Sequence, residues 1–122
     1  MVCITNGCVH YNKRVSMKNL NDKDWQAALA ANSNAVVIDV RTPEEWQEGI
    51  IPNSLLLNIM EQQSFVNRIA ELDKTVAYFV YCRSGARSGQ ACNYMSQLGF
   101  IEVINLSGGI MAYTGKTEIP TI

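Results

Sequence analysis

A cysteine that directly follows an apolar segment is the residue of this sequence best suited to nucleophilic chemistry. Residues 76–81 are all apolar or aromatic, which predicts a strand buried on both faces. The next residues, Cys82-Arg83-Ser84-Gly85-Ala86-Arg87-Ser88, predict a turn at Ser84 and Gly85 that leads into a helix. Cys82 is therefore expected at the carboxyl end of a strand and beneath a helix N-terminus, where open α/β sheets bind their ligands.

The expected surroundings of Cys82 favour its thiolate form. Backbone N–H groups of the turn and of the first helical turn point into such a crevice, and the helix dipole favours negative charge there. Arg83 and Arg87 add positive potential. Because the thiolate is the nucleophile, we predict that Cys82 is catalytic. The alternative is a buried structural cysteine, which is the usual role of a free one.

The single histidine of the chain, His10, limits the chemistry available to Cys82. It lies in the N-terminal extension, so a cysteine–histidine pair of the papain-like protease type has no obvious base. Backbone amides and arginine charge would have to activate the thiol alone. This predicts a reaction in which an anionic substrate reacts with a cysteine that is already ionised.

Length and composition describe an ordinary globular chain. Its 122 residues fit one domain, and a net charge of -1 gives no electrostatic footprint for nucleic acid. No apolar run approaches the roughly 20 residues that cross a bilayer, and the first ten residues do not form a signal-peptide pattern. We expect no nucleic-acid or membrane partner, a cytoplasmic location and four unpaired cysteines.

Strand and helix patterns alternate along the chain. Strands are expected over 14–17, 35–40, 55–59, 76–81 and 100–106, with helices over 22–31, near 42–48, within 61–72, after Gly85 and over 110–113. Asn21 is expected to cap the first helix, and Thr42, Pro43 and Glu45 form a capping-box pattern for the second. The pattern predicts an α/β fold of about five mostly parallel strands covered on both faces, over residues 14–122, after an extension of undetermined structure at 1–13.

Three segments resemble motifs of the rhodanese family, in family order. Residues 82–88 resemble its active-site loop, C-R-S-G-x-R-S. Residues 39–54 resemble D-V-R-x-x-x-E-[FYW]-x-x-G-H-I-P-G-A, and residues 106–113 resemble L-x-G-G-x-x-x-W. The chain departs from these patterns outside the loop, with Ile50 for histidine, Asn53 for glycine, Ser54 for alanine and Tyr113 for tryptophan. Asn53 is expected to preserve its turn because asparagine tolerates left-handed backbone.

The resemblance implies a three-layer rhodanese-like fold and a thiosulfate sulfurtransferase-like activity without metal or organic cofactor. Cys82 would take a sulfane sulfur from thiosulfate or from a small-molecule or protein-bound persulfide, and pass it to a thiol or to cyanide. Amides of the loop would hold the transferred sulfur, and Arg87 would contact the anionic donor. The expected substrate-binding residues are Arg83, Ser84, Gly85, Ala86, Arg87, Ser88 and, with less support, Arg41.

Two other functions are weighed against this one. Cysteine-dependent phosphatases and arsenate reductases carry C-x5-R, but here Ser88 occupies the arginine position and the arginine comes one residue earlier. This shorter loop suits one sulfur atom better than a tetrahedral oxyanion. A non-catalytic rhodanese-like binding or regulatory module is the other alternative. Such modules commonly lose the cysteine or the loop pattern, and this chain keeps both.

The remaining chemically notable residues have structural interpretations. Asp39, Arg41 and Glu45 are expected to form an ion-paired brace between a strand end and a short helix. Cys92, Trp25 and Trp46 are expected in the core, and Gly108 with Gly109 in a tight turn near the crevice. Cys3 and Cys8 with His10 are a weak hint of a metal site or of a thiol that accepts sulfur from Cys82, and neither role is assigned.

Overall fold

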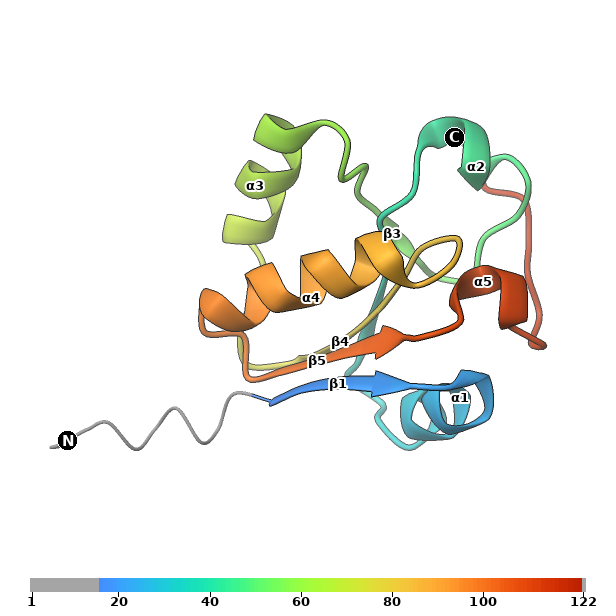
Figure 1. The fold of residues 1–122 in the computed structure, drawn as a ribbon, viewed down its shortest axis with the longest axis horizontal. Coiled ribbons are helices and arrows are strands. Elements are labelled where there is room, and N and C mark those ends of the chain that lie inside the picture. The colour runs from blue at the N-terminus through green and yellow to red at the C-terminus, as the bar shows by residue number, and fades with distance from the viewer. Residues whose placement is uncertain (1–15, 122) are drawn as a thin grey trace, which may run out of the picture.

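A five-stranded sheet of order β1-β5-β4-β2-β3 lies at the centre of the computed structural model, which describes residues 16–121 (Figure 1). The strands are β1 (Ser16–Leu20), β2 (Val36–Asp39), β3 (Leu55–Leu56), β4 (Ala77–Tyr81) and β5 (Glu102–Leu106). Each neighbouring pair is parallel, which confirms the predicted α/β class. Among the described residues, an antiparallel bridge joins Ile50 to Glu118 outside this sheet.

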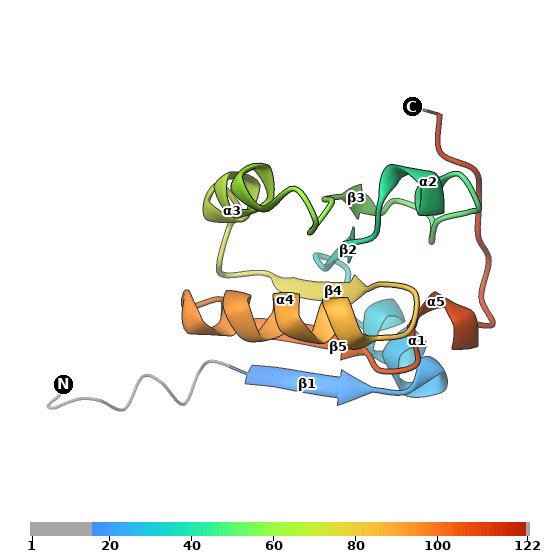
Figure 2. The same ribbon diagram turned by 45° about the horizontal axis from the view of Figure 1, so that its top comes forward.

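Helices cover both faces of the sheet, as the alternating pattern predicted. They are α1 (Asp22–Ala30), α2 (Pro43–Trp46), α3 (Gln62–Ala70), α4 (Ala86–Gln97) and α5 (Gly109–Ala112). Figures 1 and 2 show α3 and α4 on one side and α1 on the other. None of the helices within residues 16–121 has both the length and the hydropathy that a bilayer crossing requires.

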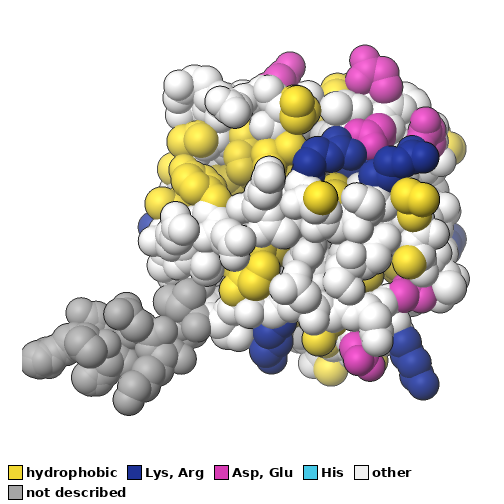
Figure 3. All heavy atoms as spheres, in the orientation of Figure 1, with side chains coloured by type: hydrophobic (Ala, Val, Ile, Leu, Met, Phe, Trp, Pro, Cys, Tyr) yellow, Lys and Arg dark blue, Asp and Glu magenta, His cyan; other side chains and the backbone are white. Residues whose placement is uncertain are grey.

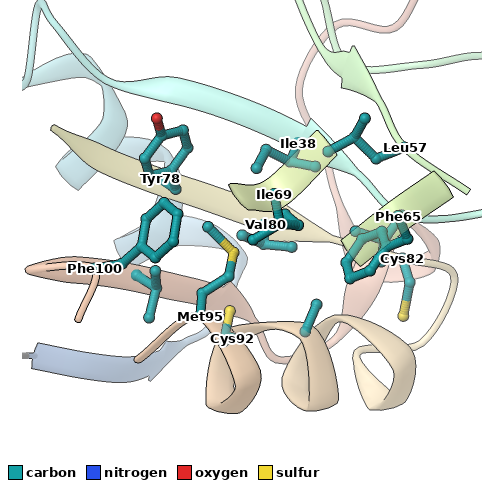
Figure 4. Packing of buried hydrophobic residues seen from close by; sticks show 13 residues of the cluster. Ile38, Leu57, Phe65, Ile69, Tyr78, Val80, Cys82, Cys92, Met95 and Phe100 are labelled. Carbon is teal, nitrogen blue, oxygen red and sulfur yellow. The ribbon is translucent and has the colours of Figure 1, made fainter. Parts of the chain in front are cut away.

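Strand β4 is the central element because it pairs with β2 on one side and β5 on the other. All five of its residues are buried, and they alternate between the two faces. Tyr78 and Val80 join the cluster beneath α3 and α4, whereas Phe79 and Tyr81 join the cluster around Trp25 of α1 (Figure 4). Cys82 therefore follows a strand that is fixed from four sides.

The local signals for helix starts and turns are confirmed. The Asn21 side chain accepts the Asp24 N–H at 2.9 Å, and Thr42 with Glu45 forms the complete capping box. Asn53 has a φ of 67°, so asparagine does provide the left-handed turn. Trp25 and Trp46 are buried, at 0% and 8% exposure, as predicted.

Two predicted strands differ most from the structure in their limits, whereas the other three begin and end within two residues of the prediction. The segment expected over 55–59 pairs with β2 only at Leu55 and Leu56, because β2 itself ends at Asp39. The first strand runs over 16–20 because it pairs along the whole of β5, from Ser16 with Glu102 to Leu20 with Leu106. Predictions for residues 1–13, including Cys3, Cys8 and His10, lie outside the described residues.

Candidate active site

The loop between β4 and α4 requires glycine at position 85. Gly85 has a φ of 103°, in the left-handed region, and immediately precedes Ala86, the first residue of α4. A Cβ atom there would collide with the carbonyl of Ser107, which follows β5. The loop thus packs tightly against the end of the neighbouring strand. Sequence proximity to Cys82 identified this glycine, but the contact with Ser107 comes from the sheet order.

The sulfur of Cys82 receives hydrogen bonds from its own loop. The Gly85 N–H donates to Sγ at 3.1 Å, and the Ser88 hydroxyl donates to Sγ at 3.4 Å. Burial raises the pKa of the Cys82 thiol, but hydrogen bonds from the Ser88 hydroxyl and from the N–H groups of Ser88, Gly85 and Ser84 outweigh it. The pKa of Cys82 consequently lies below its usual value, which favours the nucleophilic thiolate.

A second clamp on the loop comes from the start of α5. The Ile110 N–H donates to the carbonyl of Cys82 at 2.9 Å, and the Met111 N–H donates to the carbonyl of Arg83 at 3.2 Å. Gly109 has a φ of 66°, and a Cβ atom at this position would collide with the Arg83 carbonyl. The predicted glycine turn therefore lies against the Cys82 loop, where hydrogen bonds from α5 fix the positions of these two carbonyl groups.

Asn105 supports the loop from β5 and was missed by the sequence analysis. Its side chain is buried, and Nδ2 donates to the Gly85 carbonyl at 3.2 Å and to Oδ1 of Asn19 at 2.8 Å. A polar residue between the apolar neighbours Ile104 and Leu106 in the predicted strand over 100–106 was the available signal. Its partner could not be named, because the contact depends on β5 lying beside β4.

Arg41 and Asp39 form the predicted brace. Asp39 and Arg41 are 0% and 2% exposed, and Nη2 of Arg41 lies 2.7 Å from Oδ2 of Asp39. The same nitrogen donates to the Gly49 carbonyl at 2.7 Å, which fixes the turn after α2. Burial alone would lower the pKa of Arg41, but the hydrogen bonds to Asp39 and its negative charge outweigh this effect. The pKa of Arg41 is therefore raised overall, and the guanidinium is charged. These contacts give Arg41 a structural role, and we do not propose that it binds substrate.

Glu45 does not belong to that brace, which corrects the sequence-based grouping. Its Oε1 and Oε2 accept hydrogen bonds from Nη1 and Nη2 of Arg87 at 2.8 and 2.9 Å. Oε1 also accepts from the N–H and hydroxyl of Thr42. Arg87 and, against the effect of burial, Thr42 lower the pKa of Glu45 to about 2. Arg41 is unavailable to Glu45 because it is already bonded to Asp39.

The other predicted loop residues lie at the surface or along the start of α4. Arg83, Ser84 and Ala86 are exposed, whereas Ser88 is buried against the sulfur. Arg87 is half-buried; the hydrogen bonds that it donates to Glu45 raise its pKa most, and negative charge on Cys82 adds to this effect. Arg87 therefore contributes charge to the site while both of its terminal nitrogens are bonded to Glu45.

Comparison with known proteins assigns this arrangement to a family. The family model described as "Rhodanese-like domain" matches residues 22–116. The chain belongs to the rhodanese-like family. A sulfurtransferase of Allochromatium vinosum is 37% identical over 97 residues, which are 80% of this chain and 88% of that protein. YtwF of Bacillus subtilis, provisionally named a sulfurtransferase, is 34% identical over 85% of this chain and 97% of its own.

A solved structure confirms the rhodanese-like fold. The crystal structure of a rhodanese-like domain protein from Staphylococcus aureus matches with a TM-score of 0.73 and 27% sequence identity. The match covers 86% of this chain and all of that one. The predicted membership of the rhodanese family and the predicted three-layer fold are therefore confirmed.

This rhodanese-like domain compensates for its departures from the family pattern. Ile50 is buried, and its backbone forms both hydrogen bonds of the bridge to Glu118, at 2.7 and 2.8 Å. The next turn is held by the Tyr81 hydroxyl, which accepts the Ile51 N–H at 3.0 Å and lies 2.9 Å from Oγ of Ser54. Tyr113 packs edge-on against Trp25, with ring centroids 6.3 Å apart. The segment around Ile50 is thus supported without a histidine.

Cys92 is a core residue of α4, as predicted. It is completely buried in the cluster that contains Cys82 and Met95 (Figure 4). Burial, assisted by negative charge on Cys82, raises the pKa of Cys92 to about 12. This thiol is therefore neutral at physiological pH, and its pKa is shifted in the opposite direction from that of Cys82.

Removing the Ser88 hydroxyl is expected to raise the pKa of Cys82, because the thiolate loses a hydrogen bond that stabilises its negative charge. The lowered pKa keeps the thiolate at pH values below the usual range, so Ser88→Ala shifts its titration upward. Ultraviolet absorbance of the thiolate against pH measures the shift. Ser96→Ala, at the far end of the same helix, is the control. Equal titration curves for Ser88→Ala and the unmodified protein would contradict the hydrogen bond's role.

Proposed function

We propose that this protein is a sulfurtransferase that carries a sulfane sulfur on Cys82 as a persulfide. The observation that carries the proposal is the pair of hydrogen bonds to Sγ of Cys82, from Gly85 and Ser88, at the start of α4. These hydrogen bonds favour a Cys82 that is already ionised before substrate binds, so no histidine base is needed. Two relatives of this chain are named as sulfurtransferases, which supports the same class of reaction.

The proposed reaction has two displacement steps at sulfur. The Cys82 thiolate attacks the outer sulfur of thiosulfate; the donor's S–S bond breaks, and sulfite leaves with the bonding electrons. Cys82 then carries the new sulfur as Cys–S–S⁻. An acceptor thiolate attacks this outer sulfur and becomes a persulfide, while Cys82 leaves as thiolate. Cyanide attacks in the same way and becomes thiocyanate.

The loop residues have defined roles in this scheme. N–H groups between Arg83 and Ser88 are proposed to hold the negative charge of the transferred sulfur, as an oxyanion hole holds oxygen. The start of α4 adds the positive end of its dipole. Arg87 is proposed to act mainly through its charge, since each of its terminal nitrogens already donates one hydrogen bond to Glu45. No step requires a metal or an organic cofactor.

Sulfur loading measured by mass tests the proposal. The reduced protein is incubated with thiosulfate or, separately, with glutathione persulfide, and its intact mass is measured. We expect a gain of one sulfur atom on the peptide that contains Cys82, removed by cyanide with formation of thiocyanate. The Cys92 peptide serves as an internal control and should stay unloaded because its thiol is neutral and buried. A folded protein that no sulfane donor loads would instead indicate a binding module.

A further inference from the structure

We infer that the preferred sulfur donor is an organic persulfide with an apolar substituent, and not inorganic thiosulfate. This inference rests on the proposed function and names the substrate class of the same site. Two independent features carry it: an apolar cavity that borders the catalytic loop, and the ion pair that occupies Arg87.

The cavity has a volume of about 300 Å³ and lies between α3 and the first half of α4. Figure 3 shows hydrophobic side chains gathered over this region, beside basic and acidic side chains. The volume is at the lower end of the range for small-molecule sites, roughly 300–1,000 Å³. A short alkyl or aryl group fits it. Its apolar lining consists of Ile59, Met60, Phe65, Val66, Ala91 and Tyr94.

Two residues connect this cavity to Cys82. Phe65 forms part of the cavity wall and belongs to the same buried cluster as Cys82 (Figure 4). Arg87 also lines the cavity, and it is five residues after Cys82 in the catalytic loop. A substituent bound between α3 and α4 therefore ends beside the loop that holds the sulfur. Met60 and Val66, which are 66% and 39% exposed, form an apolar rim that leads into the cavity.

The Arg87–Glu45 pair disfavours a small dianion at the same place. A free guanidinium would bind the oxygens of thiosulfate through two N–H groups. In this structure one N–H of each terminal nitrogen is bonded to the Glu45 carboxylate, which Thr42 also holds, and the low pKa of Glu45 keeps that carboxylate ionised. Thiosulfate thus meets an arginine that is still charged but whose attraction for a dianion is reduced by the adjacent carboxylate of Glu45. An alkyl persulfide carries less charge and gains contact with the cavity.

The corresponding transfer is balanced without another reactant. The Cys82 thiolate attacks the outer sulfur of R–S–SH, the S–S bond of the donor breaks, and R–S⁻ leaves with the bonding electrons. The proton remains on the transferred sulfur, which becomes the outer atom of Cys82–S–SH. The departing thiolate then takes a proton from water.

The contribution of the cavity can be measured with two alkyl persulfides that share the same reacting group and differ in the length of the alkyl chain. Rates of Cys82 loading are compared for methyl and n-butyl persulfide, and we expect about a 10-fold higher kcat/KM for the butyl compound. Val66→Gln should bring this ratio close to one. Ile101→Gln is the matched control, because Ile101 is also a β-branched residue with 39% exposure but does not line the cavity. A ratio near one in the unmodified protein, or equal losses in both variants, would overturn the cavity's role.

Two matched variants test the effect of the Glu45 charge on thiosulfate. Glu45→Gln keeps an oxygen for Thr42 and Arg87 but removes the negative charge, so kcat/KM for thiosulfate should rise about five-fold. Glu44→Gln changes net charge equally at an exposed neighbouring position and should leave that rate unchanged. Equal responses would overturn the inference about thiosulfate. In either outcome, loading of Cys82 by any donor keeps the proposed function intact, whereas failure of every donor refutes the function itself.

Discussion

A Cys82→Ser variant is expected to lose sulfur transfer by roughly 10⁴-fold or more while remaining folded. The serine hydroxyl is not ionised at neutral pH and cannot form the S–S bond that stores the sulfur. The remaining loop N–H groups then have no sulfur anion to stabilise. The measurement is the initial rate of thiocyanate formation from cyanide and a sulfane donor, with urea unfolding as a check on the fold.

Cys92→Ala provides the control for this loss. Cys92 belongs to the same buried cluster, so its substitution reduces packing on α4 but leaves the loop hydrogen bonds in place. It should lower the free energy of unfolding and retain turnover. Full activity of Cys82→Ser would contradict the proposal and would move the search to the remaining cysteines, Cys3 and Cys8.

A Gly109→Ala variant is expected to lower kcat/KM about 100-fold, although Gly109 itself does no chemistry. Its new Cβ would collide with the Arg83 carbonyl, so either α5 or the loop has to move. Movement breaks the hydrogen bonds from Ile110 and Met111 that orient the carbonyls of Cys82 and Arg83. The pKa of Cys82 should rise in parallel, which thiolate absorbance against pH will show.

The matched control for this substitution is Gly99→Ala. Gly99 also has a left-handed φ, of 95°, but a Cβ atom there meets nothing within 4 Å. Both variants therefore pay a backbone cost of about 1–3 kcal/mol, and only Gly109→Ala adds the collision. Gly99→Ala should lose stability and keep activity. Equal activity in the two variants would show that the α5 clamp does not position the loop.

Local patterns were sufficient to predict the fold. The apolar segment at 76–81 predicted the central strand, and the capping signals at Asn21 and Thr42 placed two helix starts correctly. The errors concern the strands at the two edges of the sheet. Their lengths depend on how far β2 and β5 extend beside them, and this is a property of the partner strand.

The contacts of the candidate site likewise fall into those that local sequence predicts and those that depend on the packing of distant segments. Residues close to Cys82 in sequence, such as Gly85 and Ser88, could be predicted because a strand–turn–helix segment sets their positions. The hydrogen-bond partner of Glu45 could not be predicted from the sequence. Arg87 is 42 residues away, and the choice between Arg41 and Arg87 depends on which arginine Asp39 already binds. The contact between Asn105 and Gly85 and the cavity beside α3 likewise arise only when separate elements pack together.

The protonated, buried thiol of Cys92 has a consequence for kinetic order. Because Cys92 cannot compete for the sulfur on Cys82, it offers no route to an internal disulfide that would discharge the loaded protein. Under the proposed function, unloading through an external acceptor makes catalysis a double displacement, in which the first product departs before the second substrate arrives. Reciprocal plots of rate against donor concentration, drawn at several acceptor concentrations, would then be parallel lines.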